Sequence, residues 1–362
     1  MNRINTNQPI IFETLSPLPF ATTLVQCVAV KDEILICKSS EDYKNKKIQK
    51  ICDYPLNVTT VGHCVVKRIH NNNVNNVSLL SFGGREKHTL VMRYTSVWRN
   101  NNKMKNNIAY NQWIPLTDNF KKMVKIGRDE DNYEGVRAVI SGSNNHLLFI
   151  SYKPRNLDVF DLNTLQYISR NTLSIDDLLG YHCFTLMIEH PPRMVINKKK
   201  NSGLSIEYNE SVNTFQFRQL QIFPALASSI KYAYVCIENA ILFFGGYDIG
   251  RVACSKKIYM YSIKEDKWKK LDYTLPCPLF DCVALLTEHD KFVHIIGRGN
   301  RHQPMHKKIN LKKWMKEEMK RENALAIIEG EKRDIQAIKK EIAGIAEIKD
   351  GFKLKKLKVG KK

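Results

Sequence analysis

The strongest constraint on the fold is the segment KYAYVCIENAILFFGGYDIGRVACSKKIYMYSIKEDKWKKL, which contains one complete four-strand unit. Its parts, in order, are the runs Tyr232–Ile237 and Ile241–Phe244, the pair Gly245 and Gly246, the alternating run Ile258–Ile263 and a last run that opens with Trp268. Apolar and polar residues alternate with period two, and this pattern predicts antiparallel hairpins rather than helices. A single four-stranded sheet cannot cover both of its faces, so we expect the unit to stack against copies of itself.

Degenerate copies of the unit recur at intervals of about fifty residues. Six units can be counted, at approximately residues 20–53, 54–117, 133–170, 178–221, 228–273 and 279–310. The second unit keeps the double glycine as Gly83 and Gly84, and the sixth has Gly297 followed by Arg298. A glycine directly after a buried strand indicates a positive φ or a close backbone approach.

A double glycine, a tyrosine about a dozen residues later and then a tryptophan together resemble the kelch motif. Tyr259 and Trp268 hold these places in the fifth unit, and Trp113 holds the last one in the second. The resemblance implies that each unit is one blade of a β-propeller around a central channel, within the wider group of galactose-oxidase-like propellers. The units without the glycine pair leave another propeller family as an alternative.

The two ends of the repeat region predict how the ring closes. The sixth unit lacks an outer strand, whereas the N-terminal run Ile10–Leu15 is a strand without a unit. We therefore expect an all-β, six-bladed kelch-type propeller over residues 1–305, with strand 10–15 completing the last blade and removing an open sheet edge. Residues 306–362 are expected to form a basic tail, helical or flexible.

The cysteines and histidines bear on metal binding and catalysis. Five of the nine cysteines fall at similar places in the first strand of a unit: Cys27, Cys64, Cys183, Cys236 and Cys282. This recurrence, without any CxxC pair, predicts small buried side chains rather than disulfides or zinc ligands. The neighbouring pairs of His63 with Cys64 and His182 with Cys183 are interpreted in the same way.

The sequence contains no GxxxxGK, GxGxxG, GxSxG or HExxH motif. Some kelch propellers are copper radical oxidases, which need a crosslinked tyrosine and cysteine with further tyrosine and histidine ligands. Apart from having these residue types, the sequence does not mark that constellation. We expect no enzyme activity, no cofactor and no metal, with a propeller enzyme of the copper-oxidase type as the alternative.

The C-terminal segment is rich in helix formers and in lysine. Five isoleucines follow a helical spacing over two heptads: Ile328, Ile335, Ile338, Ile342 and Ile345. This stripe predicts a helix that packs on the propeller, stays in solvent, binds a partner or dimerises. The final GFKLKKLKVGKK holds no acid and six lysines, namely Lys353, Lys355, Lys356, Lys358, Lys361 and Lys362.

Charge suggests anionic partners for this tail. Lys and Arg outnumber Asp and Glu by 57 to 36, and residues 307–362 hold 18 of these cations against nine acids. Such a lysine run can bind nucleic acid or an anionic membrane surface nonspecifically, direct nuclear import, or simply aid solubility.

These features together predict a noncatalytic scaffold that binds protein partners through its propeller loops. Kelch propellers often act as ubiquitin-ligase adaptors or cytoskeletal binders, although no BTB or F-box segment is evident in this sequence. With no run of eighteen apolar residues, we expect a cytoplasmic monomer without a transmembrane segment, and a nuclear location is the alternative. The identity of the protein partner is not encoded in any motif.

Overall fold

A computed structural model describes residues 12–16, 18, 25–38, 49–98, 110–175, 178–187, 193–197, 202–227, 229–238, 240–287, 292–299, 303–318, 320 and 329–340. The described residues are mostly in β-strands. Contacts divide the chain into two compact units, Met1–Ile309 and Asn310–Lys362.

Five sheets of the first unit have four antiparallel strands each. They are β4 (His63–Ile69), β5 (Val77–Gly83), β6 (His88–Tyr94) and β7 (Ile114–Pro115); β8 (Asn132–Ser141), β9 (Leu147–Lys153), β10 (Asn156–Asp161) and β11 (Gln166–Thr172); β12 (Cys183–Met187), β13 (Arg193–Asn197), β14 (Ser202–Asn209) and β15 (Thr214–Gln221); β17 (Ala233–Ile237), β18 (Ala240–Phe244), β21 (Lys257–Ser262) and β22 (Lys267–Thr274); and β23 (Phe280–Thr287), β24 (Phe292–Arg298), β25 (Pro304–Asn310) and β1 (Phe12–Thr14).

The remaining elements are short. Strands β2 (Gln26–Val30) and β3 (Glu33–Cys37) form a two-stranded sheet, and β16 (Ser229–Ile230), β19 (Tyr247–Asp248) and β20 (Ala253–Cys254) form a small three-stranded one. The 3₁₀ turn η1 (His70–Asn72) follows β4, and helix α1 (Pro224–Ala227) follows β15.

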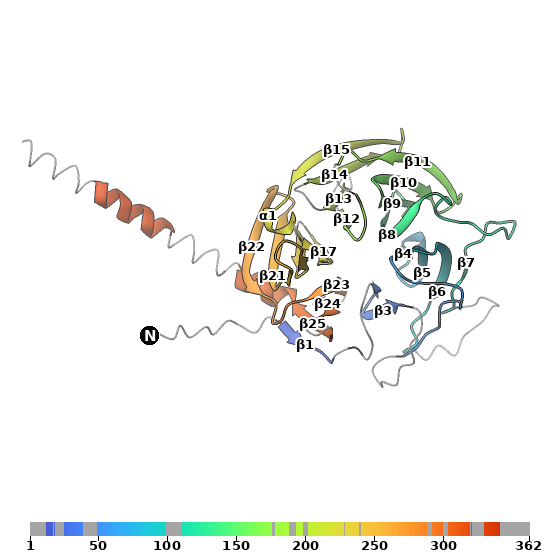
Figure 1. The fold of residues 1–362 in the computed structure, drawn as a ribbon, viewed down its shortest axis with the longest axis horizontal. Helices are drawn as coiled ribbons and strands as arrows, with labels where there is room; N and C mark the ends of the chain where they lie inside the picture. The colour runs from blue at the N-terminus through green and yellow to red at the C-terminus, as the bar shows by residue number, and fades with distance from the viewer. Residues whose placement is uncertain are drawn as a thin grey trace, which may run out of the picture. The chain divides into compact units, whose positions relative to one another are not determined.

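The large sheets stand around a common centre, with their first strands innermost and their last strands outermost (Figure 1). The β2–β3 sheet joins this ring, since β2 contacts both β23 and β4. Radially arranged antiparallel sheets of this kind define a β-propeller. The strand pattern in the sequence thus predicted the fold at this level.

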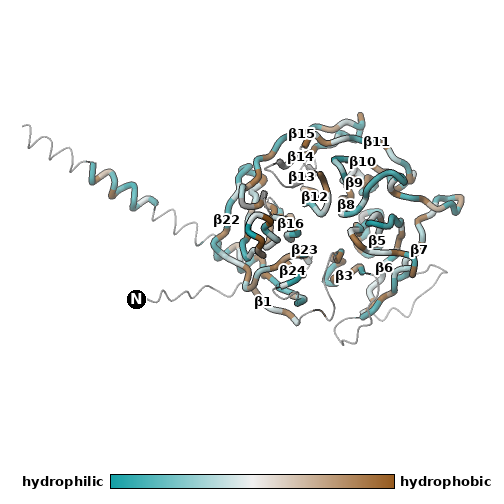
Figure 2. The backbone as a smooth tube through the Cα atoms, viewed as in Figure 1, coloured by the Kyte–Doolittle hydropathy of each residue, from teal (hydrophilic) through white to brown (hydrophobic). Residues whose placement is uncertain are grey.

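The hydrophobic core lies between neighbouring sheets. Phe82 and Cys64 of one sheet pack against Tyr133 and Ile150 of the next, and similar clusters join the following pairs of sheets. Hydropathy alternates along the strands in Figure 2, while outer strands such as β11 expose every second residue. Inner strands are apolar because neighbouring sheets bury both of their faces. Outer strands alternate with polar residues because solvent covers one of their faces.

The N-terminal strand pairs with the third strand of the last sheet. Phe12 lies opposite Ile309, and Thr14 lies opposite Lys307. The Lys307 ammonium, whose residue is only 4% exposed, donates a hydrogen bond of 2.8 Å to the Thr14 hydroxyl. This pairing gives the β23–β25 sheet its fourth strand.

Deleting residues 1–16 should therefore lower the melting temperature of the protein by about 5 °C or more. The deletion exposes the edge of β25 and leaves the buried Lys307 without its hydroxyl acceptor. Thermal unfolding of the deleted protein, compared with a matched deletion of residues 1–9 that keeps β1, measures the effect. Equal melting of the two deletions would contradict this role of the strand.

The glycine pairs adopt backbone conformations that favour glycine. Gly83 and Gly84 have φ of 76° and 93°, and Gly245 and Gly246 have φ of 65° and 96°. A Cβ on Gly245 would also lie 2.5 Å from the Leu279 carbonyl oxygen. Gly297 differs, because its constraint is steric: a Cβ there would lie 2.4 Å from the Cys282 Cβ.

The variant Gly245→Ala should lose on the order of 2–4 kcal/mol of unfolding free energy, from the collision and the left-handed backbone together. Gly250→Ala is the matched control, since a Cβ at Gly250 would meet only the Asp248 carboxylate oxygen at 3.4 Å. Its expected loss is below about 0.5 kcal/mol. Chemical denaturation measures both, and similar losses would show that the glycine pair is not a steric requirement.

The second unit contains helical residues at 311–318 and 329–340. Of the predicted isoleucine stripe, Ile335 and Ile338 are exposed on the second helix, whereas Ile328, Ile342, Ile345 and the six lysines lie outside the described residues. The predicted boundary at Met305 falls inside β25, and the compact units divide after Ile309. Among the described residues, no helix is long and apolar enough to cross a membrane.

Candidate functional site

The centre of the ring opens at the face where the first strand of each sheet begins, which we call the mouth face. At this face five residues just before or within the start of an inner strand have left-handed φ: Gly62 (73°), Gly135 (79°), Tyr181 (54°), Lys231 (57°) and Asp281 (47°). Glycine adopts this conformation freely, but tyrosine, lysine and aspartate adopt it with strain. Three sheets therefore place a tyrosine, a lysine or an aspartate where two others have glycine.

Backbone hydrogen bonds connect these positions across sheets. The Gly135 N–H donates to the Gly62 carbonyl at 2.8 Å, and the Tyr181 N–H donates to the Gly135 carbonyl at 2.8 Å. Irregular pairing also occurs at the start of β8, between Asn132 and Arg137, and at the start of β23. Irregularities of this kind redirect side chains, and here they accompany side chains that line the channel.

A cavity of about 190 Å³ occupies the mouth of the channel. Inner strands of several sheets line it, and its polar side chains are Gln26, Arg137, Tyr181, Lys231, Tyr232, Tyr234 and Asp281. The rest of its wall is valine, alanine and cysteine. The left-handed Tyr181, Lys231 and Asp281 thus converge on one small space.

Two carboxylates near the mouth are already neutralised. Asp281, with a side chain only 1% exposed, lies 3.0 Å from the Lys231 ammonium and 3.6 Å from the Arg298 guanidinium. Glu134 pairs with Arg85 at 3.3 Å and with Lys153 at 4.0 Å.

Arg137 is a cation without a carboxylate partner among the described residues. Its Nη1 donates to the Val136 carbonyl at 2.9 Å, and its guanidinium lies 5.7 Å from the centre of the Tyr181 ring. Burial raises the pKa of Tyr181 to about 12, so the phenol stays neutral at physiological pH. The mouth therefore keeps an unneutralised guanidinium in a partly apolar cavity.

The predicted structural role of the inner-strand cysteines agrees with their surroundings. Cys64, Cys183 and Cys282 are free thiols. Burial raises the pKa of Cys64 to about 11 and that of Cys282 to about 12, and it holds the pKa of Cys183 well above its usual value. Because the thiolate is the nucleophile and the metal ligand, these neutral thiols resemble core residues rather than reactive ones.

The histidines of the two His–Cys pairs are also buried, and each makes a hydrogen bond. His63 Nδ1 lies 2.6 Å from the Thr60 carbonyl, and His182 Nε2 lies 2.7 Å from the Ser151 hydroxyl. Burial lowers the pKa of His63 to about 3. Ser151 and His182 are almost completely buried, so this serine–histidine pair does not face a substrate.

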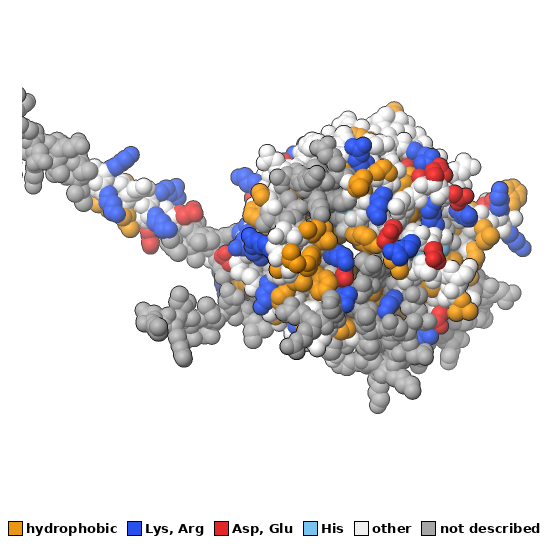
Figure 3. Space-filling model, viewed as in Figure 1, with side chains coloured by type: hydrophobic (Ala, Val, Ile, Leu, Met, Phe, Trp, Pro, Cys, Tyr) orange, Lys and Arg blue, Asp and Glu red, His pale blue; other side chains and the backbone are white. Residues whose placement is uncertain are grey.

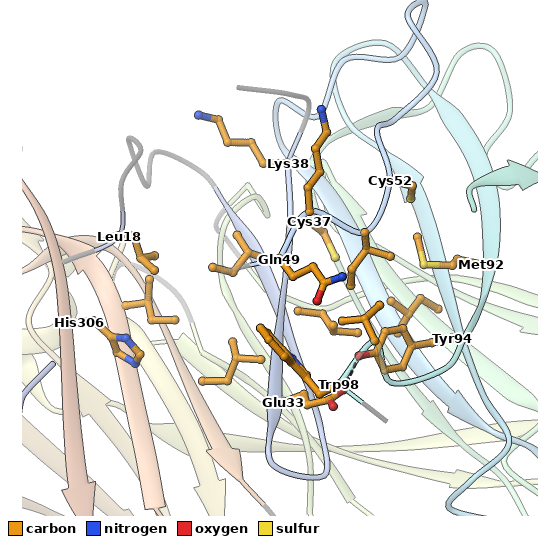
Figure 4. Close-up of a pocket in the computed structure, with 18 of the residues that line it drawn as sticks. Leu18, Glu33, Cys37, Lys38, Gln49, Cys52, Met92, Tyr94, Trp98 and His306 are labelled. Atoms are coloured by element: carbon orange, nitrogen blue, oxygen red, sulfur yellow. Dashed lines mark hydrogen bonds between the residues drawn. The ribbon is translucent and has the colours of Figure 1, made fainter. Parts of the chain in front are cut away.

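A second cavity, of about 750 Å³, lies beside β3 (Figure 4). Its wall includes Cys37, Cys52, Met92 and Trp98, and Tyr94 donates a hydrogen bond to Glu33 at its edge. The β2–β3 sheet has two strands over the described residues, whereas its neighbours fill the equivalent space with third and fourth strands. We therefore explain this cavity by the small size of that sheet.

The predicted repeat residues lie in two layers. Gly84 and Gly246 face the mouth side, where their N–H groups donate to Tyr133 and Leu279 carbonyls of the following sheet. The aromatic signature lies further out: Tyr259 is buried in β21, the Trp268 indole donates to the Gln221 carbonyl at 2.6 Å, and Trp113 stacks on Tyr54. These residues join sheets and do not line the channel cavity.

Sequence reasoning missed Arg137 and the left-handed channel residues. A signal was present, because Tyr181, Lys231 and Asp281 lie fifty residues apart and each stands at the start of an inner strand.

Seven exposed apolar side chains lie in connections of the mouth face, which follow the second and fourth strands of the sheets. They are Leu56, Val61, Phe120, Met123, Leu178, Ile249 and Val252. Figure 3 shows hydrophobic side chains near the centre of the face that carries β16, with Lys and Arg between them. Connections at the opposite face expose Val74, Trp98, Tyr110 and Val212.

No protein-family model matches the chain, and no curated protein sequence matches it. Among solved structures, it is similar to a structure of YjhT, with 12% identity, a TM-score of 0.53, and coverage of 81% of this chain and 95% of that one. It also aligns with the β-propeller domain of Cps50 (Swd1) from Myceliophteria thermophila, at 9% identity, a TM-score of 0.40, and coverage of 67% and 69%. The likeness to YjhT supports the fold alone, and the second score is too low to support more.

The inner-strand thiols should resist a thiol reagent such as DTNB at pH 8 in the folded protein. We expect Cys64 and Cys183, both buried, to react at least about tenfold more slowly than Cys277, which is half-buried, because burial keeps them protonated. Mass spectrometry of labelled peptides assigns the rates, and denaturant should expose all of them. Rapid labelling of Cys64 in the folded protein would contradict their structural role.

Proposed function

We propose that the protein is a six-bladed kelch-type propeller, closed by its N-terminal strand, that acts as a noncatalytic scaffold for a protein partner. The left-handed glycine pairs at the ends of β5 and β18 support the kelch assignment. The pairing of β1 with β25 supports the closure. The mouth face is the docking surface in this proposal.

The observation that carries the scaffold function is the set of exposed apolar side chains on the mouth face. Leu178 is 65% exposed and lies in the same connection as the cavity residue Tyr181. Val252 is 74% exposed and lies in the connection from β19 to β20, in the small sheet whose strand β16 precedes the cavity residue Lys231. Exposed apolar side chains grouped on one face are typical of interaction sites. Binding energy at such sites usually comes from a few apolar anchors surrounded by polar residues.

An enzyme of the copper-oxidase type remains the alternative from another class. Within the described part of the chain, no three His, Cys, Asp or Glu side chains come together as a metal site would require. Binding of anionic surfaces through the C-terminal lysines is a further prediction, and those lysines lie outside the described residues.

Replacing the mouth-face anchors should remove partner binding without unfolding the protein. The test variant carries Leu178→Ser, Ile249→Ser and Val252→Ser, and the matched control carries Val74→Ser and Val212→Ser at the opposite face. We expect the test variant to recover at least about tenfold less of each specific partner in affinity purification from the native cell. Circular dichroism should be the same for both variants, since all five side chains are exposed.

Comparing the test variant with the control variant also distinguishes the two faces as docking surfaces. Loss of partners from the control variant alone would place the docking surface at the opposite face. Unchanged partners for both variants would contradict a docking role for the exposed apolar residues of either face.

A further inference from the structure

The channel mouth combines backbone strain with an open cavity. Tyr181, Lys231 and Asp281 hold left-handed φ at the strand starts where two other sheets have Gly62 and Gly135, and Tyr181 makes the same backbone contact between sheets as Gly135 does. A non-glycine residue in this region costs about 1 kcal/mol or more. Because all three side chains line the same cavity, the strain is concentrated where a ligand would be held.

Two polar groups in this cavity have unused hydrogen-bonding capacity. The Nη2 and Nε of Arg137 make no hydrogen bond to the described residues, since only Nη1 bonds to the Val136 carbonyl. The Gln26 side-chain amide, in the sheet of β2 and β3, likewise has no partner in the described part of the chain. A guanidinium with free donors is suited to a bidentate carboxylate or phosphate.

The charges around the cavity favour an anion. Five cations face two carboxylates: Arg85, Arg137, Lys153, Lys231 and Arg298 against Glu134 and Asp281. The two carboxylates each pair with two cations, which leaves each cluster with an excess positive charge even before Arg137 is counted. An anion in a cavity of this kind is attracted by the whole set and bound directly by the unpaired guanidinium.

The wall of the cavity decides which anion fits. Apart from its polar groups, it consists of Val25, Cys27, Cys64, Val65, Ala138, Cys282, Val283 and Ala284. A phosphate needs donors for three or more oxygens, whereas Tyr181, Tyr234 and Lys231 of this wall already bond to protein groups. We infer that the channel mouth binds a small organic carboxylate, with its acid group on Arg137 and a short apolar body against the valine, alanine and thiol wall.

This inference does not depend on the proposed docking role of the exposed apolar residues, because the cavity lies in the channel and uses different side chains. Isothermal titration of the full chain with sodium benzoate tests it. Benzamide has the same shape without the charge, and inorganic phosphate has the charge without the apolar body. We expect heat of binding from benzoate and none from benzamide or phosphate.

The variant Arg137→Gln should weaken benzoate binding at least about tenfold. Arg251→Gln is the matched control, because Arg251 is exposed on the same face, lies outside the cavity, and pairs with Asp248 alone among the described residues. Arg137→Lys keeps the charge but loses the two parallel N–H donors of the planar guanidinium, so it should bind benzoate with intermediate affinity. This variant tests the role of Arg137 if the glutamine variant does not fold.

Lys231→Gly separates a ligand site from a purely structural contact. Glycine relieves the left-handed strain but removes one of the two cations that pair with the buried Asp281, so we expect a lower melting temperature together with a several-fold lower benzoate affinity. A lower melting temperature with unchanged affinity would assign Lys231 to the fold and overturn its place in the site. Binding of benzoate to Arg137→Gln with the affinity of the unmodified chain, or no binding to the unmodified chain up to about 10 mM benzoate, would overturn the inference as a whole.

Discussion

The structure depends on close backbone contact between neighbouring sheets at the mouth face. Two hydrogen bonds of 2.8 Å connect Gly62, Gly135 and Tyr181 across three sheets. A Cβ on Gly62 would lie 2.8 Å from the Gly135 nitrogen, so the contact exists only without a side chain on that side. The apolar clusters between sheets need the same close approach of neighbouring sheets. Packing of the core therefore depends on the left-handed backbone conformation of these residues.

This requirement also determines the chemistry of the channel. Where glycine supplies the left-handed conformation, the mouth is lined by backbone. Where Tyr181, Lys231 and Asp281 supply it, a side chain projects from a rigid strand end into the cavity. Functional groups on strand ends are held more precisely than groups on loops, and the ion pairs of Asp281 with Lys231 and Arg298 fix two of them further.

The sequence predicted what depends on local pattern and missed what depends on tertiary contact. Period-two runs gave most strands, and the glycine pairs marked true left-handed positions. The segment PMHKKIN stands where the sixth predicted unit overlaps the predicted basic tail, and it forms β25 because pairing with β1 and β24 overrides its polar composition. Arg137 had no signal, since its role comes from the convergence of several sheets on one channel.

The channel and the mouth-face anchors share one structural element. Strand β16 ends at Ile230, directly before the channel residue Lys231, and pairs with β19. The connection from β19 to β20 carries Ile249 and Val252. A ligand that holds Lys231 would therefore also hold the hairpin that presents two of the apolar anchors. Coupling between sites requires an element that both can bias, and the β16–β19–β20 sheet is the element that connects the two proposed sites.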